Sequence, residues 1–289
     1  MVCIVLVIII WGLRSVIGRN DQFISSDSIN YYIDYVDNNS KEKLQLNWKE
    51  VAAIDGLTNV DFKNINTKKI ENICLSFYEN VGEQFSIKNF DKVLDEEGFS
   101  DKEKKKAKTN LVKLNGVSLR TIRDGKNKEK DEFINELKNI SIANYREYGI
   151  LPSVTISQAI LESNWGKSKL SSKYNNYFGI KASAGWKGNS VSFSTGENYN
   201  DVIDANFRTY NSLKESVEDF GNFLNVNDRY TKNGLFDSRN YIEQTQALEN
   251  AGYSTKKNEE GEAIYADLLI DLIRENNLMI IDTEAARSN

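Results

Sequence analysis

The chain opens with thirteen consecutive apolar residues, from Met1 to Leu13, before Arg14 interrupts the run. A helix that spans a bilayer needs about 17–25 such residues, and the apolar core of a signal peptide takes about 7–15. A signal peptide also carries basic residues before its core, and none precedes this run. We therefore interpret residues 1–18 as the remainder of an N-terminal membrane anchor or signal that starts upstream. A buried segment of a soluble domain is the alternative.

Histidine is absent from the 289 residues, and only two cysteines occur, Cys3 and Cys74. Ser-His-Asp and Cys-His catalysis both need an imidazole, and zinc hydrolases need His or Cys ligands in sets of three. The composition excludes these classes, and we expect neither a metal nor another cofactor. The formal net charge of −5 does not favour nucleic-acid binding.

Residues 19–123 are predicted to form a small all-helical domain. Apolar residues at helical spacing predict a helix over Thr67–Val81, with Cys74 buried in its apolar stripe. Ser100 and Glu103 have the spacing of a capping box, and Gly116 is placed to end the helix that follows. No catalytic pattern occurs here, so the region is interpreted as a spacer, a wall-contacting module or a docking domain for a partner in an envelope complex.

The remaining chain is divided into a linker at residues 124–130, a second domain at 131–280 and a tail at 281–289. Asp131 is predicted to cap the first helix of the second domain, and Gly149 to end it. The only proline, Pro152, stands where a new helix would begin.

The helix that begins at Pro152 carries the most informative pattern. Its sequence, PSVTISQAILESNW, is largely apolar and places Glu162 near its end, before Gly166. Gln158 and Glu162 are four residues apart and share one helix face. A carboxyl among apolar side chains loses water, which raises its pKa and keeps it protonated near neutral pH, as a general acid requires. An ordinary surface glutamate at a helix end is the alternative.

The segment ILPSVTISQAILESNWGKSKLSSKYNNYFGIKA, from Ile150 to Ala182, resembles the core motif of glucosaminidase-type peptidoglycan hydrolases, glycoside hydrolase family 73. The order of later elements also fits: TGE at 195–197, NFRTY at 206–210, AGYST at 251–255 and IYA at 264–266. The resemblance covers approximately residues 131–278.

This resemblance implies a mainly α-helical protein with a lysozyme-like α+β catalytic domain and a small β-hairpin. It implies that the protein cleaves the β-1,4 bond between N-acetylglucosamine and N-acetylmuramic acid in the glycan strands of peptidoglycan, outside the cytoplasm. Glu162 corresponds to the catalytic acid. Glu197, in the hairpin, corresponds to a second acidic residue, and Tyr210 could instead orient the substrate's acetamido group for attack on the anomeric carbon.

Flat aromatic rings complement the apolar faces of sugars, and amides bond their polar groups. The predicted sugar-binding residues are Gln158, Trp165, Asn175, Asn176, Tyr177, Trp186 and Tyr230. Two other functions stay open: a lytic transglycosylase that leaves 1,6-anhydro-muramyl products, and a non-catalytic wall-binding or assembly protein.

Overall fold

The computed structural model describes residues 23–288, except 42, 82–83 and 199–200, and omits the side chains of residues 81–84 and 194–204. The predicted membrane segment, residues 1–18, therefore lies outside the described residues. In the part of the chain that is described, no helix combines the length and apolar character needed to cross a bilayer.

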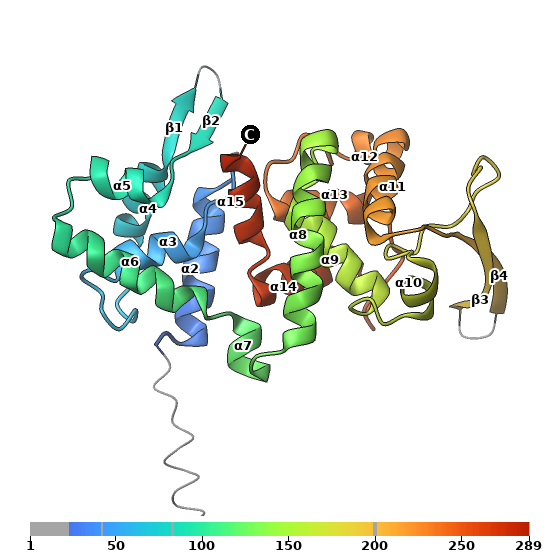
Figure 1. Ribbon diagram of the computed structural model, residues 1–289, viewed down its shortest axis with the longest axis horizontal. Coiled ribbons are helices and arrows are strands. Elements are labelled where there is room, and N and C mark those ends of the chain that lie inside the picture. Colours follow the sequence, from blue (N-terminus) through green and yellow to red (C-terminus); the bar gives the residue numbers. More distant parts are fainter. Residues whose placement is uncertain (1–22, 42, 82–83, 199–200, 289) are drawn as a thin grey trace, which may run out of the picture.

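An N-terminal lobe comprises residues 23–124 and is mostly helical (Figure 1). Its elements are α2 (Ser26–Asn39), α3 (Trp48–Asp55), α4 (Thr67–Phe77), β1 (Tyr78–Val81), β2 (Gln84–Ile87), α5 (Phe90–Glu96), α6 (Asp101–Asn115) and α7 (Leu119–Asp124). The capping box of Ser100 and Glu103 is present, and Gly116 ends α6. Cys74 is a buried free thiol in α4.

The prediction that this lobe is all-helical was wrong, because β1 and β2 form an antiparallel hairpin. The helix predicted to reach Val81 ends at Phe77. Tyr78 explains the change: its ring packs edge-on against Phe85 with 5.9 Å between centroids, and its hydroxyl donates to the Leu44 carbonyl at 2.7 Å. Such cross-strand aromatic contacts favour extended chain over one more helical turn.

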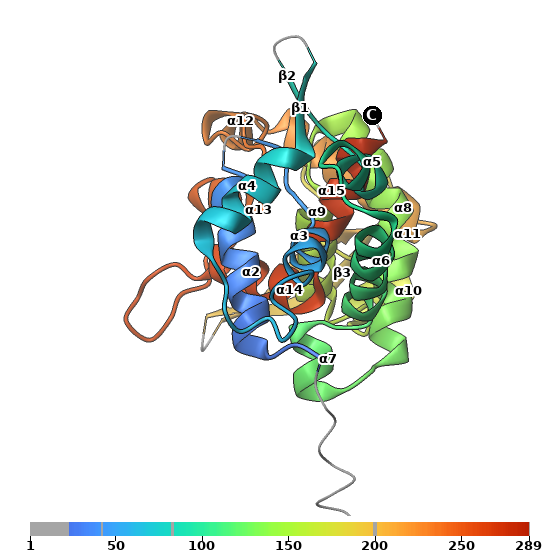
Figure 2. The same ribbon diagram turned by 90° about the vertical axis from the view of Figure 1, so that its left-hand side faces the viewer.

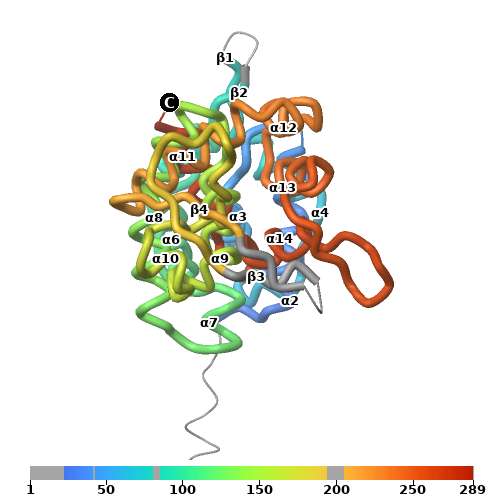
Figure 3. Tube along the Cα trace, turned by 90° about the vertical axis from the view of Figure 1, so that its right-hand side faces the viewer, coloured from blue at the N-terminus to red at the C-terminus, as the bar shows by residue number. Residues whose placement is uncertain are grey.

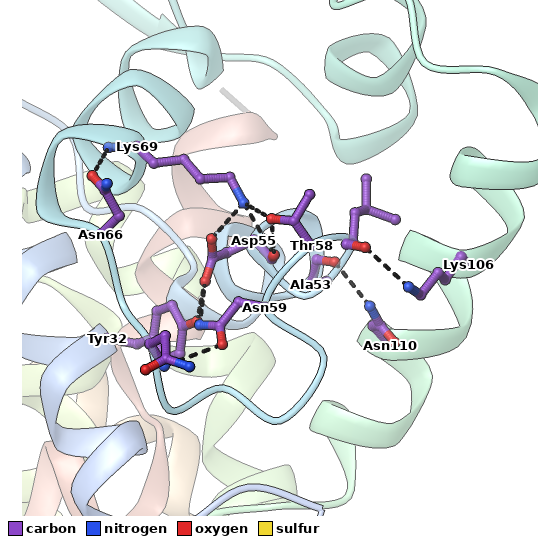
Figure 4. A network of polar contacts seen from close by, with 11 residues as sticks. Tyr32, Ala53, Asp55, Thr58, Asn59, Asn66, Lys69, Lys106 and Asn110 are labelled. Carbon is purple, nitrogen blue, oxygen red and sulfur yellow. Dashed lines mark hydrogen bonds and ion pairs between the residues drawn. The ribbon is translucent and has the colours of Figure 1, made fainter.

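A buried polar network centred on Asp55 holds the N-terminal lobe together (Figure 4). Its carboxylate accepts bonds from the Tyr32 hydroxyl at 2.5 Å, the Asn59 amide at 2.9 Å and the Lys69 ammonium at 2.7 Å. Tyr32 comes from α2 and Lys69 from α4, so the network ties both helices to the end of α3. Both oxygens of this buried carboxylate accept hydrogen bonds, as is typical of a polar residue that stabilises the fold.

A C-terminal lobe comprises residues 128–288 (Figure 1). Its elements are α8 (Lys128–Tyr148), α9 (Pro152–Ser163), α10 (Lys169–Tyr174), β3 (Ser190–Asn198), β4 (Asp201–Arg208), α11 (Leu213–Val226), α12 (Asp228–Lys232), α13 (Tyr241–Asn250), α14 (Tyr265–Asn276) and α15 (Met279–Arg287). Helix α8 is capped by Asn127 and not by Asp131, so it occupies part of the predicted linker. It ends at Gly149 in the left-handed conformation, as predicted.

Helix α9 is the central helix of the C-terminal lobe, and every residue from Pro152 to Ile160 is buried. Pro152 occupies its first turn, but the helix has no side-chain cap of its own. The caps come from other helices: Gln244 of α13 accepts from the Leu151 amide at 2.9 Å, and Asp282 of α15 accepts from the Ser153 amide at 2.8 Å. Tertiary contacts therefore satisfy backbone donors that the local sequence leaves open.

The predicted tail is largely helical: α15 lies between the two lobes in Figure 1, and Figure 2 views the molecule from the side of the N-terminal lobe. Thr283 donates to the Gln45 carbonyl at 2.8 Å, and Arg287 pairs with Glu50 at 2.6 Å. The helix buries Met279 and Ile281, which belong to a single apolar cluster that continues through both lobes. A sequence pattern cannot show this, because each lobe looks self-contained along the chain.

Candidate active site

Glu162 stands in the last turn of α9, just before an unusual turn. Asn164, Trp165 and Gly166 all have positive φ angles, of 50°, 59° and 73°. The helix ends at Ser163 with Asn164 as its left-handed cap, one turn earlier than an end at Gly166 would require. Ser163 supports the turn, because its hydroxyl oxygen accepts from the Gly166 amide at 2.7 Å. Left-handed backbone at two non-glycine residues is strained, and such strain concentrates at functional sites.

A cavity of about 430 Å³ opens beside Glu162. It lies among α9, the loop after α10, α12 and the loop after α13. Its wall is largely aromatic and apolar, with a few polar and cationic groups. The lining residues are Glu162, Phe178, Gly179, Ile180, Lys181, Ser183, Phe223, Arg229, Tyr230, Tyr253 and Ser254. Such a mixture of flat apolar surface and isolated polar groups suits a sugar, whose rings present apolar faces and polar rims.

Stacked tyrosines support Glu162 from behind. The Tyr265 hydroxyl donates to Oε1 of Glu162 at 2.9 Å. The Tyr265 ring stacks on Tyr253, with centroids 5.6 Å apart and planes 16° apart. Tyr253 in turn donates to the Phe178 carbonyl at 3.0 Å and packs near Tyr230. These packed tyrosines and the Tyr265 hydrogen bond hold the Glu162 carboxyl in one orientation at the cavity.

The protein raises the pKa of Glu162 above its ordinary value. The largest cause is desolvation by the surrounding protein, which disfavours the charged form. The Tyr265 hydrogen bond and the positive charge of Lys256 oppose this shift. Solvent still reaches the residue from outside, since it is exposed whereas the preceding turns of α9 are buried. A carboxyl with a raised pKa that remains accessible matches the expected properties of a general acid.

Three residues that were predicted to bind sugar make hydrogen bonds within the protein. Gln158 is fully buried, donates to the Tyr265 hydroxyl at 3.0 Å and is not among the residues that line the cavity. Asn176 is buried and donates to the carbonyls of Ile180 and Arg208 at 3.0 and 2.9 Å. Asn175 is the left-handed cap of α10 and donates to the Tyr210 carbonyl. The sequence showed polar residues near Glu162 but not which way they face.

Two predicted aromatic groove residues, Trp165 and Tyr177, lie against α8. Both rings pack near Phe133, each with a centroid separation of 6.1 Å. Trp165 also lies under the Lys130 ammonium. Neither lines the cavity. The left-handed conformation of Trp165 accounts for its position, because the chain has already left the axis of α9 when it reaches this residue.

Trp186 and Tyr210 form a second cluster, beside the base of the β3–β4 hairpin. The Arg208 guanidinium lies 4.3 Å from the Trp186 ring centroid and pairs with Asp219 at 2.8 Å. The Tyr210 hydroxyl donates to the same carboxylate at 2.6 Å. Tyr210 is therefore engaged with Asp219 and is not among the residues that line the cavity. Tyr230, by contrast, lines the cavity.

Glu197 lies in β3, within the predicted hairpin. Strands β3 and β4 pair antiparallel, and the register shifts between Gly196 and Asn198, at Glu197 itself. Its side chain lies outside the description. Figure 3 views the molecule from the side of this hairpin. Among the side chains that are described around the cavity, Glu162 is the only carboxylate.

Tyr253, Tyr265 and Arg229 were not predicted as site residues. Tyr253 and Tyr265 lie in the AGYST and IYA elements that carried part of the family resemblance, and Arg229 precedes Tyr230. The signal was therefore present in the sequence. Both tyrosines are far from Glu162 along the chain, however, and the packing of α13 and α14 on α9 brings them close to it.

Comparisons with known proteins show which family this chain resembles. Residues 138–278 match the glucosaminidase family, described as mannosyl-glycoprotein endo-beta-N-acetylglucosaminidase. The exo-glucosaminidase LytG of Bacillus subtilis is 34% identical over 156 residues, which are 52% of each chain. The peptidoglycan hydrolase FlgJ of Vibrio cholerae is 36% identical over 132 residues, 44% of this chain and 39% of its own. The chain thus matches about half or less of these relatives.

Among solved structures, the catalytic domain of the autolysin Auto from Listeria monocytogenes aligns with 57% of this chain and 98% of its own, at 32% identity and a TM-score of 0.46. Residues 138–278 belong to the glucosaminidase family. The resemblance to glucosaminidase-type peptidoglycan hydrolases expected from the sequence is confirmed.

Proposed function

We propose that the protein is a peptidoglycan hydrolase that cleaves the β-1,4 bond between N-acetylglucosamine and N-acetylmuramic acid. The observation that supports this best is the placement of Glu162. It stands at an aromatic-lined cavity within the glucosaminidase region, with a raised pKa and a tyrosine bonded to one oxygen. In this role Glu162 protonates the oxygen of the leaving sugar as the glycosidic bond breaks.

A second group must complete the reaction at the anomeric carbon. Because Glu162 is the only described carboxylate that lines the cavity, this group comes either from β3, where Glu197 lies, or from the acetamido oxygen of the substrate. A carboxylate base that activates water would stand about 6.5–9.5 Å from the acid carboxyl. Peptidoglycan with its acetamido groups removed separates the two routes: loss of cleavage indicates substrate assistance, and retained cleavage indicates Glu197.

A site with one carboxylate also fits a lytic transglycosylase, in which a hydroxyl of the muramic acid itself attacks the anomeric carbon and no second acid is needed. Mass spectrometry of digested, purified peptidoglycan decides between the reactions. A hydrolase leaves reducing N-acetylglucosamine ends, whereas a transglycosylase leaves 1,6-anhydro-muramyl ends. If no glycosidic bond is cleaved, both reactions are contradicted and the non-catalytic wall-binding function remains.

The location of the protein is proposed from its N-terminal sequence. Residues 1–18 would hold the enzyme at the membrane, facing the wall outside the cytoplasm. The N-terminal lobe would then be a rigid spacer or a docking surface for an envelope partner, packed directly on the catalytic lobe. Fractionation tests the anchor: recovery of the full-length protein in the soluble cytosol would contradict it.

A further inference from the structure

Gln158, Tyr265 and Glu162 form a hydrogen-bonded chain that ends at the cavity. The Gln158 side-chain amide donates to the Tyr265 hydroxyl at 3.0 Å, and that hydroxyl donates to Oε1 of Glu162 at 2.9 Å. Gln158 and Tyr265 are both fully buried. Glu162 is the one member of the chain that solvent reaches.

The orientation of the Gln158 amide sets the direction of this chain. A tyrosine hydroxyl has a single proton, whereas an amide nitrogen can only donate. With the amide of Gln158 donating to its oxygen, Tyr265 directs its own proton toward Oε1 of Glu162. If the Gln158 amide were reversed, its oxygen would accept the Tyr265 proton. A protonated Glu162 would then donate to Tyr265, and the proton would be hidden from the substrate.

Gln158 also has an energetic cost that an apolar residue at this position would not have. Its Oε1 atom is buried and has no hydrogen-bond partner. A buried polar atom without a partner costs about 1–3 kcal/mol, and an apolar side chain of similar length would fill the same space without that cost. The glutamine is therefore better explained by the bond that its nitrogen makes.

We propose that Gln158 is a positioning residue that acts through Tyr265. By fixing the direction of the Tyr265 proton, it makes Oε1 of Glu162 an acceptor and leaves Oε2 as the oxygen that carries the transferable proton. This inference rests on the proposed role of Glu162 as general acid. It replaces the earlier assignment of Gln158 to sugar binding.

The charged and titratable groups around Glu162 set the sign of the expected effect. They come from α12, α14, the loop after α10 and the loop between α13 and α14: Lys181, Arg229, Tyr230, Tyr253, Lys256 and Tyr265. The bond from Tyr265 stabilises the ionised carboxylate and lowers the pKa of Glu162. A Tyr265 hydroxyl that is no longer held by Gln158 donates less well, so the pKa of Glu162 rises.

Gln158→Met removes the donor and keeps the length of the side chain. We expect kcat on purified peptidoglycan to fall about tenfold, a fraction of the range for general acid catalysis, with little change in KM. The alkaline limb of the pH profile should move to higher pH. Carbon-13 NMR titration of Glu162 in the free protein should show the same upward shift of its pKa. An unchanged limb and an unchanged titration would overturn the proposal.

Gln244→Met is the matched control. Gln244 is also a fully buried glutamine, but its side chain bonds the backbone at the start of α9, at Gly149 and Leu151. This substitution should lower the melting temperature without moving the alkaline limb or the titration of Glu162. If it shifts both as Gln158→Met does, the effect belongs to packing of α9, and the positioning role is wrong.

Tyr265→Phe completes a double-mutant cycle. Because Gln158 acts through the Tyr265 hydroxyl, Gln158→Met should add almost nothing to the titration shift in the Tyr265→Phe background. Full additivity would contradict the proposal. The titration needs no substrate, so a wild-type protein that fails to cut peptidoglycan refutes the proposed function while the positioning of the Glu162 proton is still measured.

Discussion

At the residue scale, the site depends on a carboxyl that is both accessible and partly desolvated. Glu162 faces a cavity on one side and a stack of tyrosines on the other. The tyrosines remain neutral, because burial raises the pKa of Tyr253 and Tyr265 well above the usual value. They therefore act as hydrogen-bond donors and apolar surface, and Glu162 is the acid of this cluster whose ionisation changes the charge of the site.

Glu162→Gln should reduce cleavage of purified peptidoglycan by 10²-fold or more, since an amide cannot supply the proton. The melting temperature should stay the same or rise, because the substitution removes a desolvated carboxyl. Turbidity loss of wall suspensions and calorimetry measure the two quantities. Wild-type rates in the variant would remove Glu162 from the mechanism.

The raised pKa of Glu162 also predicts a pH profile. A general acid works only while protonated, so activity should persist above the pH at which an ordinary glutamate ionises and fall as Glu162 loses its proton. Increasing the salt concentration screens Lys256 and should move this fall slightly upward. Rates measured across pH at constant ionic strength test this, and a fall centred at an ordinary glutamate value would contradict it.

Glu197→Gln tests the hairpin residue. If the substrate acetamido group attacks the anomeric carbon, this variant should lose less activity than Glu162→Gln. If Glu197 activates the water, the two losses should be similar. Rates on intact peptidoglycan give the comparison, and Asp219→Asn serves as a control for general damage near the hairpin, since Asp219 holds Arg208 and Tyr210.

At the scale of single elements, α9 carries Glu162 near its C-terminal end, and side chains from other helices cap its N-terminal end. Asp282 of α15 accepts from the Ser153 amide at 2.8 Å and from the Ser153 hydroxyl at 2.6 Å. Burial raises the pKa of Asp282 from 3.8 to about 7, and these bonds only partly oppose the shift. The helix that presents Glu162 is thus anchored by the segment predicted as a tail.

Asp282→Asn should change how stability depends on pH. The native state keeps the Asp282 proton up to about pH 7, whereas the unfolded chain loses it near pH 3.8. The contribution of this group to stability is therefore fully present below pH 3.8 and declines as the pH rises to 7. Asparagine mimics the protonated acid, so the variant should lose this decline and gain a few kcal/mol at pH 8. Urea unfolding at pH 5 and pH 8 tests this; an unchanged slope would contradict it.

At the scale of the whole molecule, the two lobes share buried polar bonds as well as one apolar cluster. Asp37 of α2 accepts from Arg274 of α14 at 2.9 Å and from the Tyr241 hydroxyl of α13. Trp48 of α3 donates to Asn277 at 3.1 Å. Such a buried network between elements far apart in sequence favours one cooperative unfolding unit over two independent domains.

Removing residues 1–124 should therefore destabilise the C-terminal lobe. Truncation leaves Tyr241, Arg274 and Asn277 without their buried partners, at about 1–3 kcal/mol for each group that stays buried. We expect a single calorimetric transition in the longer chain and a markedly lower midpoint in the truncated one. Two separate transitions, or an unchanged midpoint, would show that the lobes are independent.

The sequence by itself identified the family of hydrolases that the chain resembles and the ends of several helices. The absence of histidine removed whole classes of hydrolase, and the capping box at Ser100, Pro152 and the glycines at 116 and 149 marked helix ends, because these signals act through neighbouring residues. Glu162 was predicted as the general acid from its position at the end of an apolar helix within a recognisable motif.

Only the tertiary structure decided which side chains face the cavity. Gln158 and Asn176 are buried, and the rings of Trp165 and Tyr177 pack against Phe133 of α8. The tyrosines next to Glu162 are Tyr253 and Tyr265. The reason is geometric: three successive left-handed residues redirect the chain after α9, and the packing of α14 brings a distant tyrosine against it. Neither the direction of a side chain nor a contact across a hundred residues is encoded in local spacing.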